Sequence, residues 1–209
     1  ELHYFISIAG LATYVALFGT INTITVLSAK KIKLQSTLYL ISLVIGAIST
    51  VVLIILFNRI DTGFLLFGYI ISSLVIGELI GKQEFSKYFI YVLIQKFSSL
   101  ILGISFYYLF GVEGILYALA ISFSFYLIRI YKELKTHKID FSLLKKNISF
   151  VSNNYFTYLA AGVNGTVDKL LIMPLLGPVV VGNYSLALQF FSIMLIFPDI
   201  IFKYILPHD

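Results

Sequence analysis

Seven apolar runs, each long enough to cross a membrane as a helix, constrain this chain more than any other feature. They lie near residues 4–27, 37–57, 63–80, 88–110, 112–131, 149–175 and 180–206. A bilayer core needs roughly 20 apolar residues per helix, and the runs are continuous rather than alternating, which excludes barrel strands. With 59% hydrophobic residues, 12% charged residues and a mean hydropathy of +0.97, the chain lies outside the range of soluble domains. We expect an all-α, multi-pass membrane protein with about seven transmembrane helices.

The loops between these runs alternate in basic residues. Every second loop, together with the segment after the last run, is basic and holds Lys30, Lys31, Lys33, Lys82, Lys87, Arg129, Lys132, Lys135, Lys138, Lys145, Lys146 and Lys203. The other loops contain only Arg59 among basic residues, beside Asp61 and Glu113. Basic loops favour the cytoplasmic side. The chain is therefore expected to start outside and end inside, in the cytoplasmic membrane.

The longest polar segment, residues 132–147, divides five runs from two. Its sequence "KELKTHKIDFSLLKKN" combines Ile139, Leu143 and Leu144 with several lysines, a pattern typical of a short helix lying in the membrane plane. We expect residues 1–131 to form most of one bundle, residues 132–147 to be a cytoplasmic linker, and residues 148–209 to begin a second bundle. Because the first residue is Glu1, we interpret the chain as part of a longer protein that packs with the remainder of its own chain.

The composition argues against several classes of function. The chain has no cysteine, and its histidines lie near the two ends and in one polar loop, so we expect no metal site and no cofactor. The net charge of +5 follows from the basic loops, which indicates contact with membrane lipids rather than nucleic acid. No two acidic residues are adjacent or two apart, although a membrane glycosyl- or prenyltransferase needs such metal-binding clusters. We therefore do not expect an enzyme.

A few polar residues lie deep within the runs. They are Gln95 and Lys96 in the fourth run, and Asn164, Asp168, Lys169 and Gln189 in the last two. A charge at the centre of a span costs about 2.5–3.5 kcal/mol on insertion scales, so these groups should face protein or a wet cavity and have partners. Two interpretations remain open, a substrate pathway and a neutralised structural pair. Adjacent residues point about 100° apart on a helix, so Asp168 and Lys169 are expected to pair with other helices rather than with each other.

The stretch "GELIGKQ" has the small-xxx-small spacing, from Gly77 to Gly81, that lets two helices approach closely. It is not a P-loop, because the glycine spacing is one residue short and Gln83 follows the lysine. Glu78 lies at the cytoplasmic end of its span, so we expect it to snorkel or to pair with a loop residue.

The second half resembles a known family. Its stretch "NNYFTYLAAGVNGTVDKLLIMPLLGPVVVGNYSLALQFF" is similar to the start of a repeat in polysaccharide and lipid-linked oligosaccharide flippases of the multidrug/oligosaccharidyl-lipid/polysaccharide exporter superfamily. The matching residues are Val167, Asp168, Lys169, Leu170, Leu171, Gly177, Gly182, Tyr184, Leu186 and Ala187. Lys169 replaces the usual arginine, and Pro174 with Pro178 makes the turn stiffer. Residues 81–122 resemble the family's fifth and sixth helices, and "ALFGTINTITVLSAKK" resembles the end of its second.

The resemblance implies helices two to eight of a two-bundle fold with about 12 to 14 helices. It also implies export of a polyprenyl-pyrophosphate-linked oligosaccharide by alternating access, for cell-surface polysaccharide synthesis. Cations deep in the spans would line a wet cavity for the pyrophosphate. In this interpretation Lys96 and Lys169 contribute charge, Asp168 holds a helix contact, and Gln95, Asn164 and Gln189 are further cavity candidates.

Two alternatives stay open. A drug/cation antiporter of the same superfamily would place acidic residues in the early helices, which are nearly free of them. A non-transporting seven-span protein is the other alternative.

Overall fold

The computed structural model describes residues 2–205, except the side chains of residues 163–166, 197, 199, 200 and 203–205. This part of the chain is helical throughout and contains no strand. Its elements, in order, are α1 (Leu2–Ala16), α2 (Thr20–Ala29), α3 (Gln35–Phe57), α4 (Ile60–Gly81), α5 (Phe85–Phe110), α6 (Val112–Ser122), α7 (Tyr126–Thr136), α8 (Phe141–Lys146), α9 (Ile148–Leu176) and α10 (Pro178–Ile205).

Six of the described segments are long and apolar enough to cross a membrane, and a seventh span results if α1 and α2 are counted as one. The expectation of an all-α, multi-pass membrane protein is therefore confirmed at this level. α6 and α7 together form one of the six, Val112–Thr136. Its hydrogen bonding tightens where α6 meets α7, because the N–H groups of residues 123, 124 and 126–128 bond to carbonyls three residues back.

Three of the long helices end at a residue with positive φ. Asn58 (φ 51°) ends α3, Gly111 (φ 68°) ends α5 and Gly177 (φ 85°) ends α9. Glycine reaches these angles at no steric cost, and asparagine tolerates the left-handed region better than most residues. Pro178 then begins α10, where its missing N–H is not needed.

The first apolar run is broken, contrary to the single continuous span expected from the sequence. Phe18 (φ 50°) and Gly19 (φ 69°) separate α1 from α2, and the two helices are bent by 56°. A Cβ atom on Gly19 would lie 2.4 Å from the backbone nitrogen of Tyr155 in α9. The break therefore depends on a close contact with a distant helix, which hydropathy cannot reveal.

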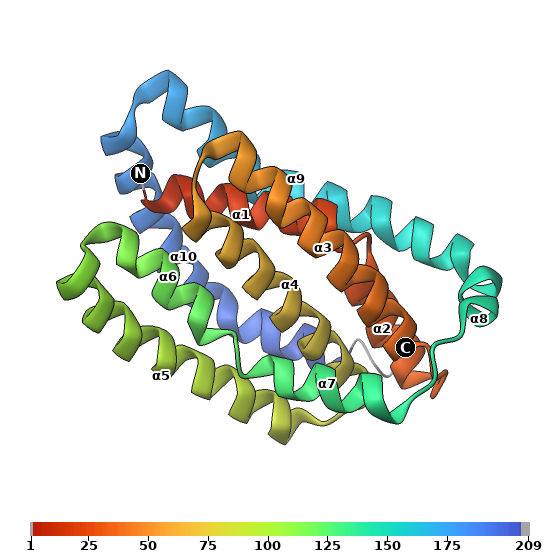
Figure 1. The fold of residues 1–209 in the computed structure, drawn as a ribbon. Coiled ribbons are helices and arrows are strands. Elements are labelled where there is room, and N and C mark those ends of the chain that lie inside the picture. Colours follow the sequence, from red (N-terminus) through yellow and green to blue (C-terminus); the bar gives the residue numbers. More distant parts are fainter. Residues whose placement is uncertain (1, 206–209) are drawn as a thin grey trace.

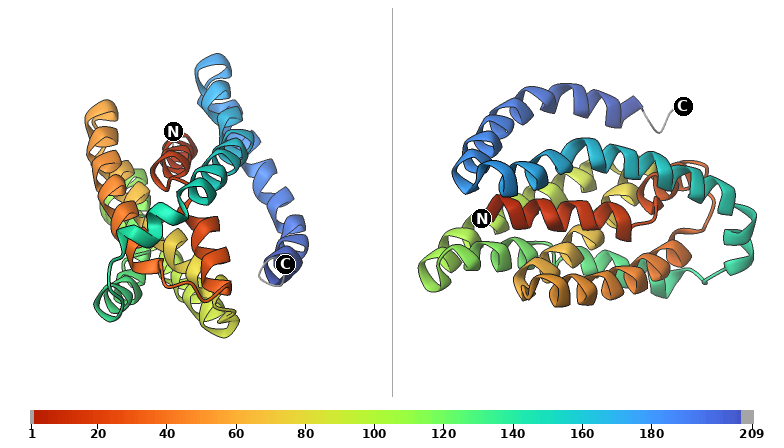
Figure 2. Two further views of the ribbon diagram at one scale, coloured as in Figure 1. Left: turned by 90° about the vertical axis from the view of Figure 1, so that its right-hand side faces the viewer. Right: turned by 90° about the horizontal axis from the view of Figure 1, so that it is seen from above.

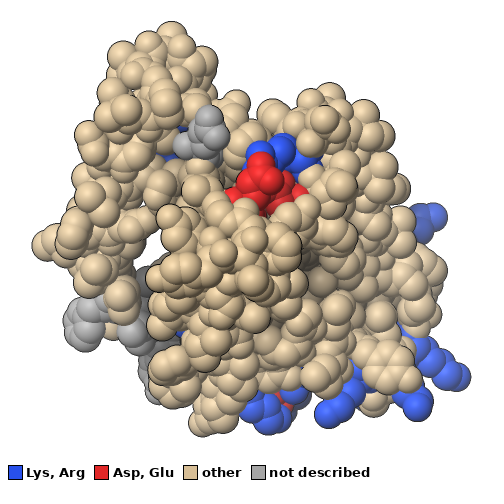
Figure 3. Space-filling model, turned by 60° about the vertical axis from the view of Figure 1, so that its left-hand side comes forward, with Lys and Arg blue, Asp and Glu red and all other residues tan. Residues whose placement is uncertain are grey.

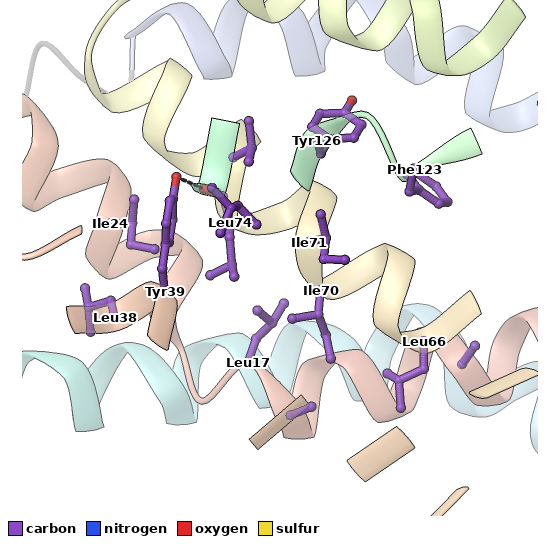
Figure 4. Packing of buried hydrophobic residues seen from close by; sticks show 14 of the residues in the cluster. Leu17, Ile24, Leu38, Tyr39, Leu66, Ile70, Ile71, Leu74, Phe123 and Tyr126 are labelled. Atoms are coloured by element: carbon purple, nitrogen blue, oxygen red, sulfur yellow. Dashed lines mark hydrogen bonds between the residues drawn. The ribbon is translucent and has the colours of Figure 1, made fainter. Parts of the chain in front are cut away.

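α4 is the central helix of the fold. It contacts α1, α2, α3, α5, α6 and α7, and it lies between α3 and the α5–α6 pair (Figure 1). Its buried side chains pack with Leu17, Ile24 and Tyr39 in one continuous apolar core. Figure 4 shows Tyr39 beside Leu74, whose carbonyl oxygen accepts a hydrogen bond from the Tyr39 hydroxyl at 3.4 Å.

Glycines allow α4 to pack closely on α2. A Cβ atom on Gly81 would lie 2.3 Å from the Thr25 carbonyl oxygen, and one on Gly77 would lie 3.1 Å from the Ile21 carbonyl oxygen. The Thr25 hydroxyl also donates to the Gly77 carbonyl oxygen at 3.1 Å. The close approach predicted from the Gly77–Gly81 spacing is therefore present.

The last two long helices differ in how much they pack. α9 packs on α1 and crosses the α1–α2 break, where Tyr155 stacks on Phe18 with ring centroids 4.3 Å apart. α10 contacts α9 and, at fewer positions, α1, and it forms one border of the molecule (Figure 2). α9 is thus attached to the first apolar run, while α10 exposes large apolar side chains such as Phe190 and Met194.

The polar linker contains the helix expected there, but only as the short α8. Asp140 caps it by accepting a hydrogen bond from the Leu143 N–H at 3.0 Å. The Asp140 N–H donates to the Thr37 hydroxyl at 2.9 Å, which fixes the linker to the start of α3. Leu143 and Leu144 are half-buried against the core, so α8 lies against the protein.

Charged side chains gather at the two ends of the helices. The Lys82 and Glu133 side chains meet at one end and Arg59 and Glu113 at the other, in agreement with the alternation of the loops. Between these ends the surface is mostly uncharged; Figure 3 shows basic groups gathered near one border and an acidic patch, with basic atoms beside it, in a hollow. We call the two ends the lysine-rich end and the Arg59 end.

Candidate functional site

The α9–α10 hairpin contains the most specific part of the sequence motif. Asp168 of α9 accepts a hydrogen bond from the Tyr184 hydroxyl of α10, and it also accepts from the Lys169 backbone N–H at 2.8 Å. Both partners belong to the motif on which the family resemblance rests. The helix contact expected of Asp168 is therefore present, and it ties α9 to α10 near their turn at Gly177.

Lys169 is half-buried and does not pair with its neighbour Asp168. It lies seven residues before Leu176, or roughly 10 Å from the end of α9 at 1.5 Å per residue. Because α9 begins as early as Ile148, this places Lys169 in the third of the span nearest the Arg59 end. Lys169 also lies close enough to His3 of α1 to affect it electrostatically. The described residues offer Lys169 no carboxylate partner.

In α5, the two adjacent polar residues have different environments. Gln95 is buried and donates to the Ser122 hydroxyl at 3.2 Å, where α6 ends. Lys96 is exposed, and Leu93 and Leu100 on the same face of the helix are exposed as well. It lies eleven residues after Phe85, about 16 Å along the helix and near its middle. No described carboxylate pairs with it.

The remaining candidates add no partner to this set. The Gln189 side chain is exposed on α10. The backbone carbonyl oxygen of Gln189 accepts a hydrogen bond from the Ser192 hydroxyl at 2.7 Å. The side chain of Asn164 lies outside the described residues. Lys96 and Lys169 are not brought together, because α5 and α9 run along opposite sides of α4 (Figure 1). Within the described chain, the candidate cations therefore occupy two separate surfaces.

The largest cluster of charged groups in the described part of the chain lies at the lysine-rich end and centres on Glu78. Its carboxylate is fully buried and accepts from the Tyr39 hydroxyl, from Lys82 Nζ at 2.5 Å and from an Arg129 terminal nitrogen at 2.7 Å. Three elements, α3, α4 and α7, thus meet on one carboxylate. The sequence predicted that Glu78 either snorkels or pairs with a loop residue. Glu78 is paired, and its side chain is buried rather than snorkelling.

The cluster extends outward through further ion pairs. Lys82 Nζ also bonds to Glu133 at 2.9 Å, and Arg129 bonds to Glu84 at 3.1 Å. Glu84 in turn pairs with Lys87 at 3.1 Å. Three carboxylates balance three cations, so the cluster offers no net charge for an anionic or cationic ligand. We call these six residues the Glu78 cluster.

Burial tends to lower the pKa of the Lys82 ammonium, but its hydrogen bonds to Glu78 and Glu133 outweigh this and raise the pKa above its usual value. These bonds stabilise the folded protein fully at any pH below the pKa that Lys82 has in the unfolded chain. The stabilisation is lost only as the pH rises through the raised pKa of Lys82 in the folded protein. Lys82 therefore stays charged at neutral pH.

The role of Glu78 was only partly visible in the sequence. Glu78 and Lys82 are four residues apart, as are Arg129 and Glu133, which is the spacing of ion pairs along one helix. That spacing suggests local pairs. The pairing of Arg129 with Glu78 depends on how α7 packs against α4, and no pattern in the sequence predicts it.

At the Arg59 end, one guanidinium joins three elements. Arg59 bonds to Asp61 at 2.7 Å and to Glu113 at 2.7 Å, and it lies 4.7 Å from the centre of the Phe5 ring. Its hydrogen bond to Asp61 raises the pKa of Arg59 further, so it stays charged. Asp61 is buried and also accepts from the Thr62 N–H at 2.7 Å. This cluster connects the α3–α4 turn to the starts of α1 and α6.

No set of three or more metal-binding side chains comes together among the described residues. Comparison with protein-family models, with curated protein sequences and with solved structures finds no match to this chain.

Proposed function

We propose that this chain is part of a flippase that moves a polyprenyl-pyrophosphate-linked oligosaccharide across the cytoplasmic membrane by alternating access, without catalytic chemistry. The observation that carries the proposal is the presence of two intramembrane lysines, Lys96 and Lys169, with no carboxylate partner among the described residues. Among the side chains that the structure describes, the intramembrane carboxylates of Asp168 and Glu78 are both engaged. A free cation deep in a span is costly unless it serves a ligand or a wet cavity.

The two lysines also belong to different parts of the proposed two-bundle fold. Lys96 belongs to the five-run part and Lys169 to the part that follows the linker at residues 132–147. Because the two lysines lie on separate surfaces of the described chain, a substrate cavity that includes both must be completed by other helices. In the proposed two-bundle fold of about 12 to 14 helices, further spans of the same protein cover the exposed faces of α5 and α10 and enclose this cavity.

The antiporter alternative has less support. Such a protein needs an acidic residue free to exchange a cation, whereas Glu78 is neutralised by Lys82 and Arg129 and Asp168 is bonded to Tyr184. The flippase proposal requires no free carboxylate.

The test is export of the lipid-linked sugar by variants of the complete protein. Lys96→Ala and Lys169→Ala should each reduce export roughly 10- to 100-fold, because a hydrogen bond to a charged group contributes about 1.5–3 kcal/mol. Lys169→Arg should restore most of the export. Lys135→Ala, at an exposed position near the end of α7, is the matched control and should export normally.

Membrane abundance must be measured for each variant, so that lost export is not confused with lost protein. Normal export by both Lys96→Ala and Lys169→Ala, at parental abundance, would overturn the proposal.

A further inference from the structure

An open apolar groove runs between α1 and α3. It has a volume of about 450 Å³, within the roughly 300–1,000 Å³ range of small-molecule sites. α1 contributes Tyr4, Ile8, Leu11, Ala12 and Val15, α3 contributes residues 48, 49, 52, 53, 56 and 57, and α9 contributes Leu170. Apart from Ser49 and the Tyr4 hydroxyl, the lining side chains are hydrocarbon or aromatic.

The groove lies in the half of the membrane nearest the Arg59 end. The contributing part of α3 lies in its second half, from Ile48 to Phe57, and the groove follows α1 from Tyr4 to Val15, or roughly 16 Å. Val52 and Leu56 are both exposed, at 49% and 71%, so the groove opens to the side, where lipid lies. Its dimensions and direction suit a hydrocarbon chain running along the membrane normal.

Apolar lining alone does not select a ligand in this setting. Lipid tails are as apolar as leucine, so a chain gains little by moving from lipid into the groove. Selection must come from a charged group at the rim. Leu170, which lines the groove, directly follows Lys169, and Tyr4 directly follows His3, which lies close enough to Lys169 to interact with it. Lys169, which has no carboxylate partner among the described residues, therefore lies beside the groove, where the headgroup of an anionic lipid would lie.

We propose that the groove between α1 and α3 holds the polyprenyl chain of the lipid-linked substrate, with its phosphate groups beside Lys169. This inference rests on the proposed function, and it assigns the lipid part of the substrate to a specific surface. The chain stays in the membrane while the sugars cross, so it needs a lateral groove next to the cation that binds the pyrophosphate.

The experiment is photo-crosslinking in vesicles of phosphatidylcholine that contain a small fraction of polyprenyl phosphate. A photoreactive phenylalanine analogue replaces Val52 in the groove or, as the matched control, Ile101, which is 62% exposed on α5 and does not line the groove. Val52 should crosslink polyprenyl phosphate at least severalfold more than Ile101. Lys169→Gln should reduce the Val52 signal severalfold, whereas Lys135→Gln, at an exposed position near the end of α7, should leave it unchanged.

Blocking the groove gives a second measurement. Ala12→Phe should abolish crosslinking by filling the groove, and Ala187→Phe, at an exposed position of α10, should not. Equal crosslinking at Val52 and Ile101, no effect of Lys169→Gln, or equally strong labelling by a photoreactive phosphatidylglycerol would each overturn the inference. Groove-specific, Lys169-dependent crosslinking in a protein that exports nothing would instead overturn the flippase proposal and leave the groove as a polyprenyl phosphate site.

Discussion

Glu78 is the residue whose replacement should most affect stability. Removing its carboxylate leaves Lys82 and Arg129 partly buried without their main partner, and breaking a buried ion pair costs roughly 3–5 kcal/mol. We expect Glu78→Ala to lie near the lower end of that range, because Glu133 and Glu84 remain as secondary partners. The measurement is the loss of helical circular dichroism on heating in detergent.

The matched control is Glu113→Ala. Its carboxylate also pairs with an arginine, but its side chain is 65% exposed, and exposed ion pairs contribute about 0–1 kcal/mol. Equal unfolding temperatures for the two variants would show that burial does not decide the contribution of these pairs.

At the scale of elements, the packing of α2 on α4 depends on the absence of side chains at two glycines. Gly81→Ala should destabilise the protein by about 1–3 kcal/mol, because its Cβ atom would overlap the Thr25 carbonyl oxygen. Gly77→Ala should cost less, since its nearest atom is further away. Gly103→Ala, with nothing nearby, should stabilise α5 by about 0.5–1 kcal/mol through helix propensity. Thermal unfolding that ranks these three variants in another order would contradict the close approach of α2 and α4.

α8 should respond to acid through its N-cap. The hydrogen bond from the Leu143 N–H holds the pKa of Asp140 below its usual value of 3.8. A lowered pKa means that the carboxylate stabilises α8 above pH 3.8, and that this effect fades as the pH falls through the lowered value. Hydrogen exchange should show protection at Leu143 that is lost in strong acid and, at neutral pH, in Asp140→Ala. Asp140→Asn keeps a capping oxygen and should keep the protection at both acidic and neutral pH.

At the scale of the whole molecule, the orientation in the membrane is the main prediction. The chain has no cysteine, so single substitutions can be labelled without further engineering. Cysteine at Glu113 should react with an impermeant reagent added outside, and cysteine at Lys31 or Lys138 should react only after the membrane is opened. Asp61, in the outer loop by sequence, is a poor probe because it is 2% exposed. Outside labelling at Lys138 would invert the topology.

The helical class, the number of spans to within one, and the separation of charged groups into two ends could all be predicted from the sequence. The physical reason is that lipid offers no hydrogen bonds, so a long apolar run must satisfy its own backbone as a helix. The close approach of two helices at Gly77 and Gly81 could also be predicted from the sequence, because it depends on the absence of side chains at these positions.

Which polar groups meet could not be predicted, because it depends on how the helices pack. Glu78 became the centre of a buried cluster because α7 brings Arg129 to it from 51 positions further along the chain. Asp168 bonds to Tyr184 because the turn after α9 brings α10 alongside it. Lys96 lies on an exposed face of α5, although its neighbour Gln95 is buried. The break at Gly19 likewise depends on the backbone of α9. Hydropathy reports the cost of placing each residue in lipid, whereas partners are set by helix packing over long distances in sequence.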